Sequence, residues 1–153
     1  MRRASGFTLF EMMVVVLVAA VLALVAAPSL TSLIAKQRLR SAASSLHLAM
    51  VQARAEAIKR NTSVTVSPAA GGWSSGWSIL DPENPGGPAL EVVAIPQGVV
   101  VTTTVAQVVY RGNGRTTSDA AMSFGLTGGA DGASRCVKIE GTGRPYSKEG
   151  SCE

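Results

Sequence analysis

The sequence predicts an α+β protein in which one long N-terminal helix packs on an antiparallel β-sheet domain. The chain has no charged residue from Met12 to Ala35, and a helix of that length reaches about 36 Å. Apolar and small residues then recur at helical spacing as far as Ala57. Beyond Asn61, short alternating segments separated by Gly- and Pro-rich turns indicate strands.

Length and composition indicate one globular domain with an added apolar segment. The 153 residues are 46% hydrophobic and only 16% charged, which is apolar for a soluble domain of this size. We divide the chain into a leader at 1–6, a transmembrane helix at 7–35, an amphipathic helix extension at 36–61 and a β-rich domain at 62–153. The uncharged run is long enough to cross the hydrocarbon core of a bilayer, so one spanning segment is expected.

The helix extension is expected to bury a stripe of small and apolar residues against a second layer. The stripe comprises Leu39, Ala42, Leu46, Ala49, Ala53 and Ala57. Asn61 and Thr62 are weak helix formers and should end the helix. Strands are expected near 63–66, 76–80, 90–95, 99–104, 108–111, 121–126 and 136–139, with turns or loops at 81–88, 112–114 and 128–132.

The net charge of +4 is weak support for a nucleic-acid partner. Two of the 14 basic residues, Arg2 and Arg3, lie in the leader, which leaves 12 basic residues against 10 acidic ones. Most of the surplus lies on the helix extension, at Lys36, Arg38, Arg40, Arg54, Lys59 and Arg60. The first three are expected to meet lipid headgroups or acidic patches of neighbouring subunits.

The N-terminus differs from an ordinary secretory signal. Such a signal places its cleavage site after a short apolar stretch, whereas Gly6 comes before a long one. Cleavage between Gly6 and Phe7 would therefore keep the apolar helix in the mature protein.

Glu11 lies one turn inside this apolar helix, where an ionisable side chain costs about a few kcal/mol unless it finds a partner. After cleavage, the α-amino group of Phe7 on a neighbouring subunit is a cation at similar depth. Pairing with it would set the axial register of subunits during assembly. The alternative is that Glu11 extends to the headgroups at the membrane surface.

The segment from Gly6 to Glu11, with the apolar residues that follow it, resembles the prepilin signature of type IV pilins and type II secretion pseudopilins. The resemblance implies that a prepilin peptidase cuts after Gly6, that Phe7 becomes N-methylated, and that Glu11 acts in assembly. Pro28 falls where many members carry a helix-kinking proline.

Four later segments resemble the GspH/FimT branch of minor pilins and pseudopilins. They are the junction at 53–66, a hairpin containing Trp73 and Trp77, the strand and turn at 110–115, and the turn at 142–144. The two tryptophans are interpreted as cross-strand packing around a tight turn, with a ligand platform as the alternative.

The resemblance implies a type IV pilin-like fold and assembly with other pilins or pseudopilins at an inner-membrane assembly platform. It also implies a single-pass protein of the bacterial inner membrane, in contact with lipid, whose C-terminal domain is periplasmic until it enters a pilus or pseudopilus. Type II secretion and type IV pilus assembly both remain open.

Cys136 and Cys152 are the only cysteines. In an oxidising compartment they can form a disulfide worth about 3 kcal/mol by the loop-entropy argument, and a pair of reduced thiols is the alternative. No metal site or cofactor is expected. The single histidine, His47, is interpreted as a packed or solvated helix residue, and the protein is not expected to be an enzyme.

DNA binding in natural transformation is the alternative function. FimT-like members are implicated in DNA uptake through a Gly-Arg-any-Arg pattern, and this chain has Tyr146 in place of the second arginine. The candidate contacts are Arg135, Lys138, Arg144, Tyr146 and Lys148, with basic residues on phosphates and the tyrosine on a base. The competing interpretation is a solvent loop of mixed charge held by the disulfide.

Overall fold

The structure is a computed structural model that describes residues 7–84, 86–129 and 132–152, without the side chains of 24–29. It divides into two compact units, one ending at Ile34 and one beginning at Ala35. A single helix, α1 (Leu9–Arg60), contributes to both. Gly6 and the rest of the expected leader lie outside the described residues.

The first unit consists of the N-terminal part of α1, and its described apolar side chains are exposed, as Phe10 (76%) and Leu17 (65%) illustrate. Among the residues whose side chains are described, no helix has both the length and the apolar character of a membrane span. The expected span at 7–35 includes positions 24–29, and Pro28 with them, whose side chains lie outside the description.

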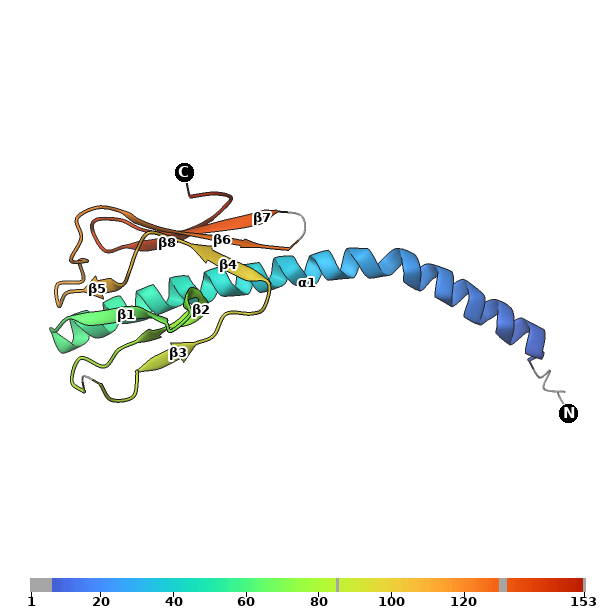
Figure 1. The fold of residues 1–153 in the computed structure, drawn as a ribbon, viewed down its shortest axis with the longest axis horizontal. Coiled ribbons are helices and arrows are strands. Elements are labelled where there is room, and N and C mark those ends of the chain that lie inside the picture. The colour runs from blue at the N-terminus through green and yellow to red at the C-terminus, as the bar shows by residue number, and fades with distance from the viewer. Residues whose placement is uncertain (1–6, 85, 130–131, 153) are drawn as a thin grey trace, which may run out of the picture. The chain divides into compact units, whose positions relative to one another are not determined.

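The second unit contains eight strands in two four-stranded antiparallel sheets (Figure 1). The first sheet has the order β3-β2-β1-β5 and is built from β1 (Val64–Ala69), β2 (Gly72–Ile79), β3 (Glu91–Val93) and β5 (Val108–Tyr110). The second has the order β4-β6-β7-β8 and is built from β4 (Val99–Thr102), β6 (Met122–Gly128), β7 (Ala133–Ile139) and β8 (Pro145–Glu149).

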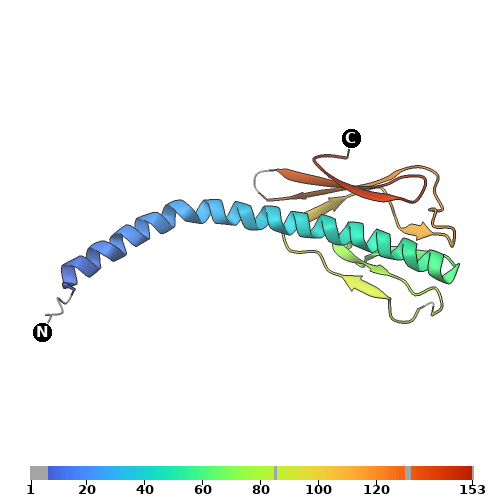
Figure 2. The same ribbon diagram turned by 180° about the vertical axis from the view of Figure 1, so that it is seen from behind.

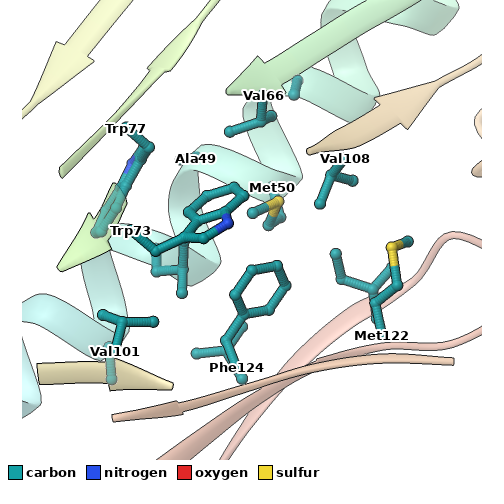
Figure 3. Packing of buried hydrophobic residues seen from close by; sticks show 14 of the residues in the cluster. Ala49, Met50, Val66, Trp73, Trp77, Val101, Val108, Met122 and Phe124 are labelled. Atoms are coloured by element: carbon teal, nitrogen blue, oxygen red, sulfur yellow. The ribbon is translucent and has the colours of Figure 1, made fainter. Parts of the chain in front are cut away.

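Both sheets and the C-terminal half of α1 contribute to one hydrophobic core. All six residues of the predicted stripe are at most 2% exposed, and Ala43 and Met50 join them. Figure 3 shows Met50 beside Trp73, with Phe124 of the second sheet below. Small side chains on α1 let both sheets approach the helix closely, which confirms the predicted layer arrangement.

Seven strands were predicted at nearly the right places, and β8 was missed. Its segment was interpreted as a solvent loop of mixed charge, and in the strand all four residues after Pro145 are exposed. An edge strand with proline at its start and charged residues along it is a common protected edge. The interpretation as a solvent loop is therefore wrong for 145–149.

The predicted tryptophan hairpin is also wrong, since Trp73 and Trp77 lie on the same strand, β2. The turn precedes Gly72, and the pairing of β1 with β2 shifts between Pro68 and Ala69. Both tryptophans are buried in the core. Trp73 packs against Phe124 of the opposite sheet, and the two indoles do not face each other across a hairpin.

The irregular part of β2 connects the two sheets. Trp73 Nε1 donates to the carbonyl of Val105 at 2.7 Å, and the indole packs edge-on against Phe124 with ring centroids 4.9 Å apart. Ser74 Oγ accepts from the Val101 N–H at 2.9 Å and donates to the Val101 carbonyl at 3.2 Å. One side chain thus satisfies both backbone groups of an edge residue in β4.

The helix ends as predicted, at Arg60. Asn61 adopts a positive φ of 50°, and its N–H donates to Ile58 O at 3.2 Å. The N–H of Thr62 reaches back to Ala57 O, also at 3.2 Å. These two bonds form a Schellman cap, which satisfies carbonyls that the last turn would leave unpaired.

Arg60 connects the end of α1 to the loop after β2. Its guanidinium contacts Glu56 at 2.8 Å, Asp81 at 3.0 Å and Glu83 at 3.2 Å. The hydrogen bond from Arg60, assisted by Lys59, holds the pKa of Glu56 below its usual range. The loop therefore depends on charge pairing for its anchor to the helix.

Replacing Leu46 with alanine should lower the free energy of unfolding by about 2–5 kcal/mol, because this fully buried side chain leaves a cavity in the core. Leu48→Ala is the matched control, since Leu48 is on the same helix but 59% exposed. It should change stability by less than about 0.5 kcal/mol. Urea unfolding of both variants measures the difference, and equal effects would contradict the core assignment.

The stabilising effect of Glu56 should be lost in acid. A carboxyl whose folded pKa is depressed contributes stability above its unfolded pKa, and the contribution disappears as the pH falls through the folded value. The stability difference between wild type and Glu56→Gln should therefore be largest at neutral pH and shrink toward pH 3. Glu140→Gln is the comparison, because Glu140 is exposed and accepts a long hydrogen bond from the Thr142 hydroxyl, at 3.4 Å.

Candidate processing and assembly site

Helix α1 begins at Leu9, two residues after Phe7, which follows the expected cleavage point. Thr8 is the N-cap residue of the helix. Its Oγ1 accepts the N–H of Glu11 at 3.2 Å, and its carbonyl accepts the N–H of Met12 at 3.2 Å. The cap fixes where the helix starts relative to the Gly6–Phe7 bond.

Glu11 is exposed in the first turn of α1, and the described part of the chain gives its carboxylate no ion pair. A negative charge in the first turn is favourable because it faces the positive end of the helix dipole. Phe7 is 74% exposed. The side chains of both residues are thus exposed.

Thr8 is a functional candidate that the sequence interpretation missed. The spacing Thr-x-x-Glu from Thr8 to Glu11 is that of a capping box, in which the first side chain caps the backbone of the fourth residue. This spacing is the signal in the sequence that identifies Thr8 as the N-cap residue. Thr8 positions the backbone that carries Glu11.

The predicted turns at 112–114 and 142–144 meet each other at the end of α1. Arg54 Nε donates to the carbonyl of Gly114 at 2.9 Å. Gly143 has a φ of 82°, and a Cβ there would lie 2.3 Å from Gly114 O. Three of the segments that resembled the GspH/FimT branch are therefore in contact in the fold.

Four of the five candidate DNA contacts lie on β7 and β8, whose register places Lys138, Tyr146 and Lys148 on one face of the second sheet and Arg135 on the other. Arg135 forms an ion pair with Glu149, which also lies 3.8 Å from Arg40 on the helix. Lys138 is opposite Tyr146, and Lys148 is opposite Cys136, in the pairing of β7 with β8. Arg144 is exposed in the turn before β8. Glu149 therefore compensates the positive charge of Arg135, one of the five candidates.

Cys136 and Cys152 are joined in a disulfide, with Cα atoms 5.1 Å apart. Cys136 is fully buried although it lies on β7 beside exposed residues of β8. The bond holds the C-terminal segment against the second sheet. The sequence left open a disulfide or a pair of reduced thiols, and the structure contains the disulfide.

Gly143→Ala should lower the free energy of unfolding more than Gly150→Ala does. Both glycines have positive φ, 82° and 91°, so both substitutions carry the same backbone strain. A Cβ at Gly143 also meets Gly114 O, while nothing lies within 4 Å of one at Gly150. In thermal unfolding, Gly143→Ala should destabilise the protein by at least about 1 kcal/mol more than Gly150→Ala does. Equal destabilisation would mean that the two turns do not touch.

Several known proteins are similar to this chain. Residues 1–27 match the prokaryotic N-terminal methylation motif, and residues 42–143 match the family of type II transport protein GspH. No curated protein sequence matches the chain.

Two solved proteins share the fold. The type IV minor pilin FimU of Pseudomonas aeruginosa aligns at 22% identity with a TM-score of 0.64, over 77% of this chain and 97% of that one. The minor pseudopilin EpsH of the type 2 secretion system of Vibrio cholerae aligns at 12% identity with a TM-score of 0.60, over 73% of this chain and 97% of that one. Because the GspH match covers most of the sequence, the chain belongs to the GspH family.

Proposed function

We propose that this chain is a minor pilin or pseudopilin that is cleaved after Gly6, N-methylated at Phe7 and assembled into a type IV pilus or a type II secretion pseudopilus. One observation carries the proposal: the N-terminal methylation motif and the GspH domain occur in one chain, linked by a single helix. In this proposal residues 7–35 are the membrane anchor and the second unit is periplasmic.

The arrangement at the start of α1 supports the processing step. Thr8 caps the helix, so Phe7 remains outside the hydrogen-bonded turns. A peptidase needs an extended backbone on both sides of the bond that it cuts, and a helix that began before Phe7 would deny this. The prepilin peptidase is accordingly the first partner that we propose.

Glu11 is the assembly residue in this proposal. Its carboxylate has no ion pair among the described residues, and a carboxylate in an apolar environment gains most from a cation. The mature α-amino group of Phe7 on the adjacent subunit supplies that cation. The other partners that follow are further pilins or pseudopilins and the inner-membrane assembly platform.

DNA binding is not carried forward as a second function. Arg135 is already paired with Glu149, and the similarity to GspH, FimU and EpsH concerns family and fold. We therefore propose the filament role alone.

Co-expression with a prepilin peptidase should remove residues 1–6 and add one methyl group to the new N-terminus, as intact-mass spectrometry can show. Glu11→Gln should be processed normally but enter filaments at least about tenfold less, because the charge pair is lost. Glu83→Gln is the control, since Glu83 is a surface carboxylate far along the sequence from the processing site. Unchanged incorporation of Glu11→Gln in sheared filaments would refute the assembly role, and an uncleaved chain would refute the proposal itself.

A further inference from the structure

A cavity of about 350 Å³ lies on the outer face of the first sheet, beside the loop that follows β2. Side chains alternate along a strand, so Ser63 and Thr65 face away from the core that holds Val64 and Val66. Leu80 continues the same face, and its N–H donates to the Thr65 carbonyl at 2.9 Å. The loop after β2 lies beside the C-terminal end of α1 in both views (Figure 1 and Figure 2). The lining of the cavity includes Ser63, Thr65, Leu80, Asp81, Pro82 and Asn84.

The loop that forms one wall of the cavity is held by hydrogen bonds. Asp81 Oδ1 accepts from the Arg60 guanidinium at 3.0 Å and from the N–H of Glu83 at 3.1 Å. The carbonyl of Asn84 accepts from the N–H of Gly87 at 3.0 Å. A Cβ at Gly87 would collide with the Asn84 side chain, so glycine at this position leaves room for the amide. These contacts fix where the carboxylate and the amide lie in the wall.

The polar groups that line the cavity can form further hydrogen bonds. Among the described residues, the hydroxyls of Ser63 and Thr65 and the side-chain amide of Asn84 form no hydrogen bond. Both hydrogen bonds to the carboxylate of Asp81 end on Oδ1, so within the same part of the chain Oδ2 accepts none. Hydroxyls and amides both donate and accept, whereas a carboxylate oxygen accepts. A few polar groups that converge in a cavity are typical of a binding site.

The charge of the lining favours a neutral ligand. Asp81 is the only ionisable residue among the described residues of the lining, and Arg60 balances its charge. An anion would be repelled by this carboxylate. A calcium ion takes about six to eight oxygen ligands, with carboxylates among them, and a single carboxylate that is already paired with arginine attracts such a cation weakly. A neutral ligand with many hydroxyl groups meets neither obstacle.

The remaining walls suit the ring of a sugar. Leu80, which is 42% exposed, and Pro82 present aliphatic surface, on which the C–H groups of a pyranose ring are removed from water. The hydroxyl groups around such a ring can then meet the donors and acceptors of the lining. The volume of the cavity is at the lower end of the range of about 300–1,000 Å³ for ligand pockets, which suits a short saccharide.

We propose that this cavity binds a neutral saccharide, whose hydroxyls donate to Asp81 Oδ2 and form hydrogen bonds with the hydroxyls and the amide of the lining. The cavity shares no residue with the processing and assembly site at the start of α1, so it adds a second activity to the proposed function. A subunit with such a site brings glycan chains into contact with the assembly that contains it.

Saturation-transfer NMR on the full-length protein measures the binding, because it detects weak ligands. The protein is held in micelles of dodecylphosphocholine, a detergent without a sugar that could occupy the cavity. The neutral probes are cellobiose and N,N′-diacetylchitobiose, which represent plain glucans and N-acetylated glycan strands. At least one should bind, and at least about tenfold more tightly than digalacturonate, whose carboxylates Asp81 repels. Calcium chloride should leave this binding unchanged.

Matched double variants locate the binding surface. Ser63→Ala with Thr65→Val removes two hydroxyls from the lining and should weaken binding of the neutral probe at least about tenfold. Ser67→Ala with Ser78→Ala is the control and should leave binding unchanged. These two serines are paired with each other on the same face of the sheet, outside the cavity. Unchanged thermal unfolding of each variant confirms that the fold is intact.

Absence of saturation transfer to both neutral probes would overturn the proposal. Tighter binding of digalacturonate, displacement of the neutral probe by calcium, or equal weakening in the two double variants would also overturn it. None of these measurements needs cleavage after Gly6, so failure of the proposed function is recognised separately, by mass spectrometry.

Discussion

The close packing of small residues on α1 against two sheets is the constraint on which the second unit depends. Four buried positions of the helix are alanines, whose small side chains let the strands come close: Ala42, Ala49, Ala53 and Ala57. The larger core residues can then come from the sheets, as Trp73 and Phe124 do. Larger residues at these four alanine positions would hold the sheets further from the helix.

The same packing explains which parts of the fold could be predicted from sequence. Periodicity identifies a buried stripe directly, because every fourth or third position must face the sheets, and the six predicted residues are indeed buried. The end of the helix is equally local, since Asn61 tolerates the positive φ that the cap requires. Both features are decided by neighbours in the chain.

Features decided by distant partners were not predictable in the same way. β8 has a polar pattern, and it is a strand because β7 is available to pair with it. Trp73 and Trp77 have the spacing of a tight hairpin, yet the turn lies earlier because the pairing with β1 shifts at Ala69. The three carboxylates around Arg60 come from a helix and a loop, and only the fold brings them together. In the candidate site, Gly6, Phe7 and Glu11 follow from a local motif, whereas the pairing of Arg135 with Glu149 does not.

The hydroxyl of Ser74 protects part of an exposed sheet edge from pairing with another chain. An edge strand with open backbone groups is a template on which another chain can add a strand. The Ser74 hydroxyl occupies both the N–H and the carbonyl of Val101, so β4 is closed at that residue from within its own domain. Addition of a strand from another chain is blocked at this residue of the β4 edge.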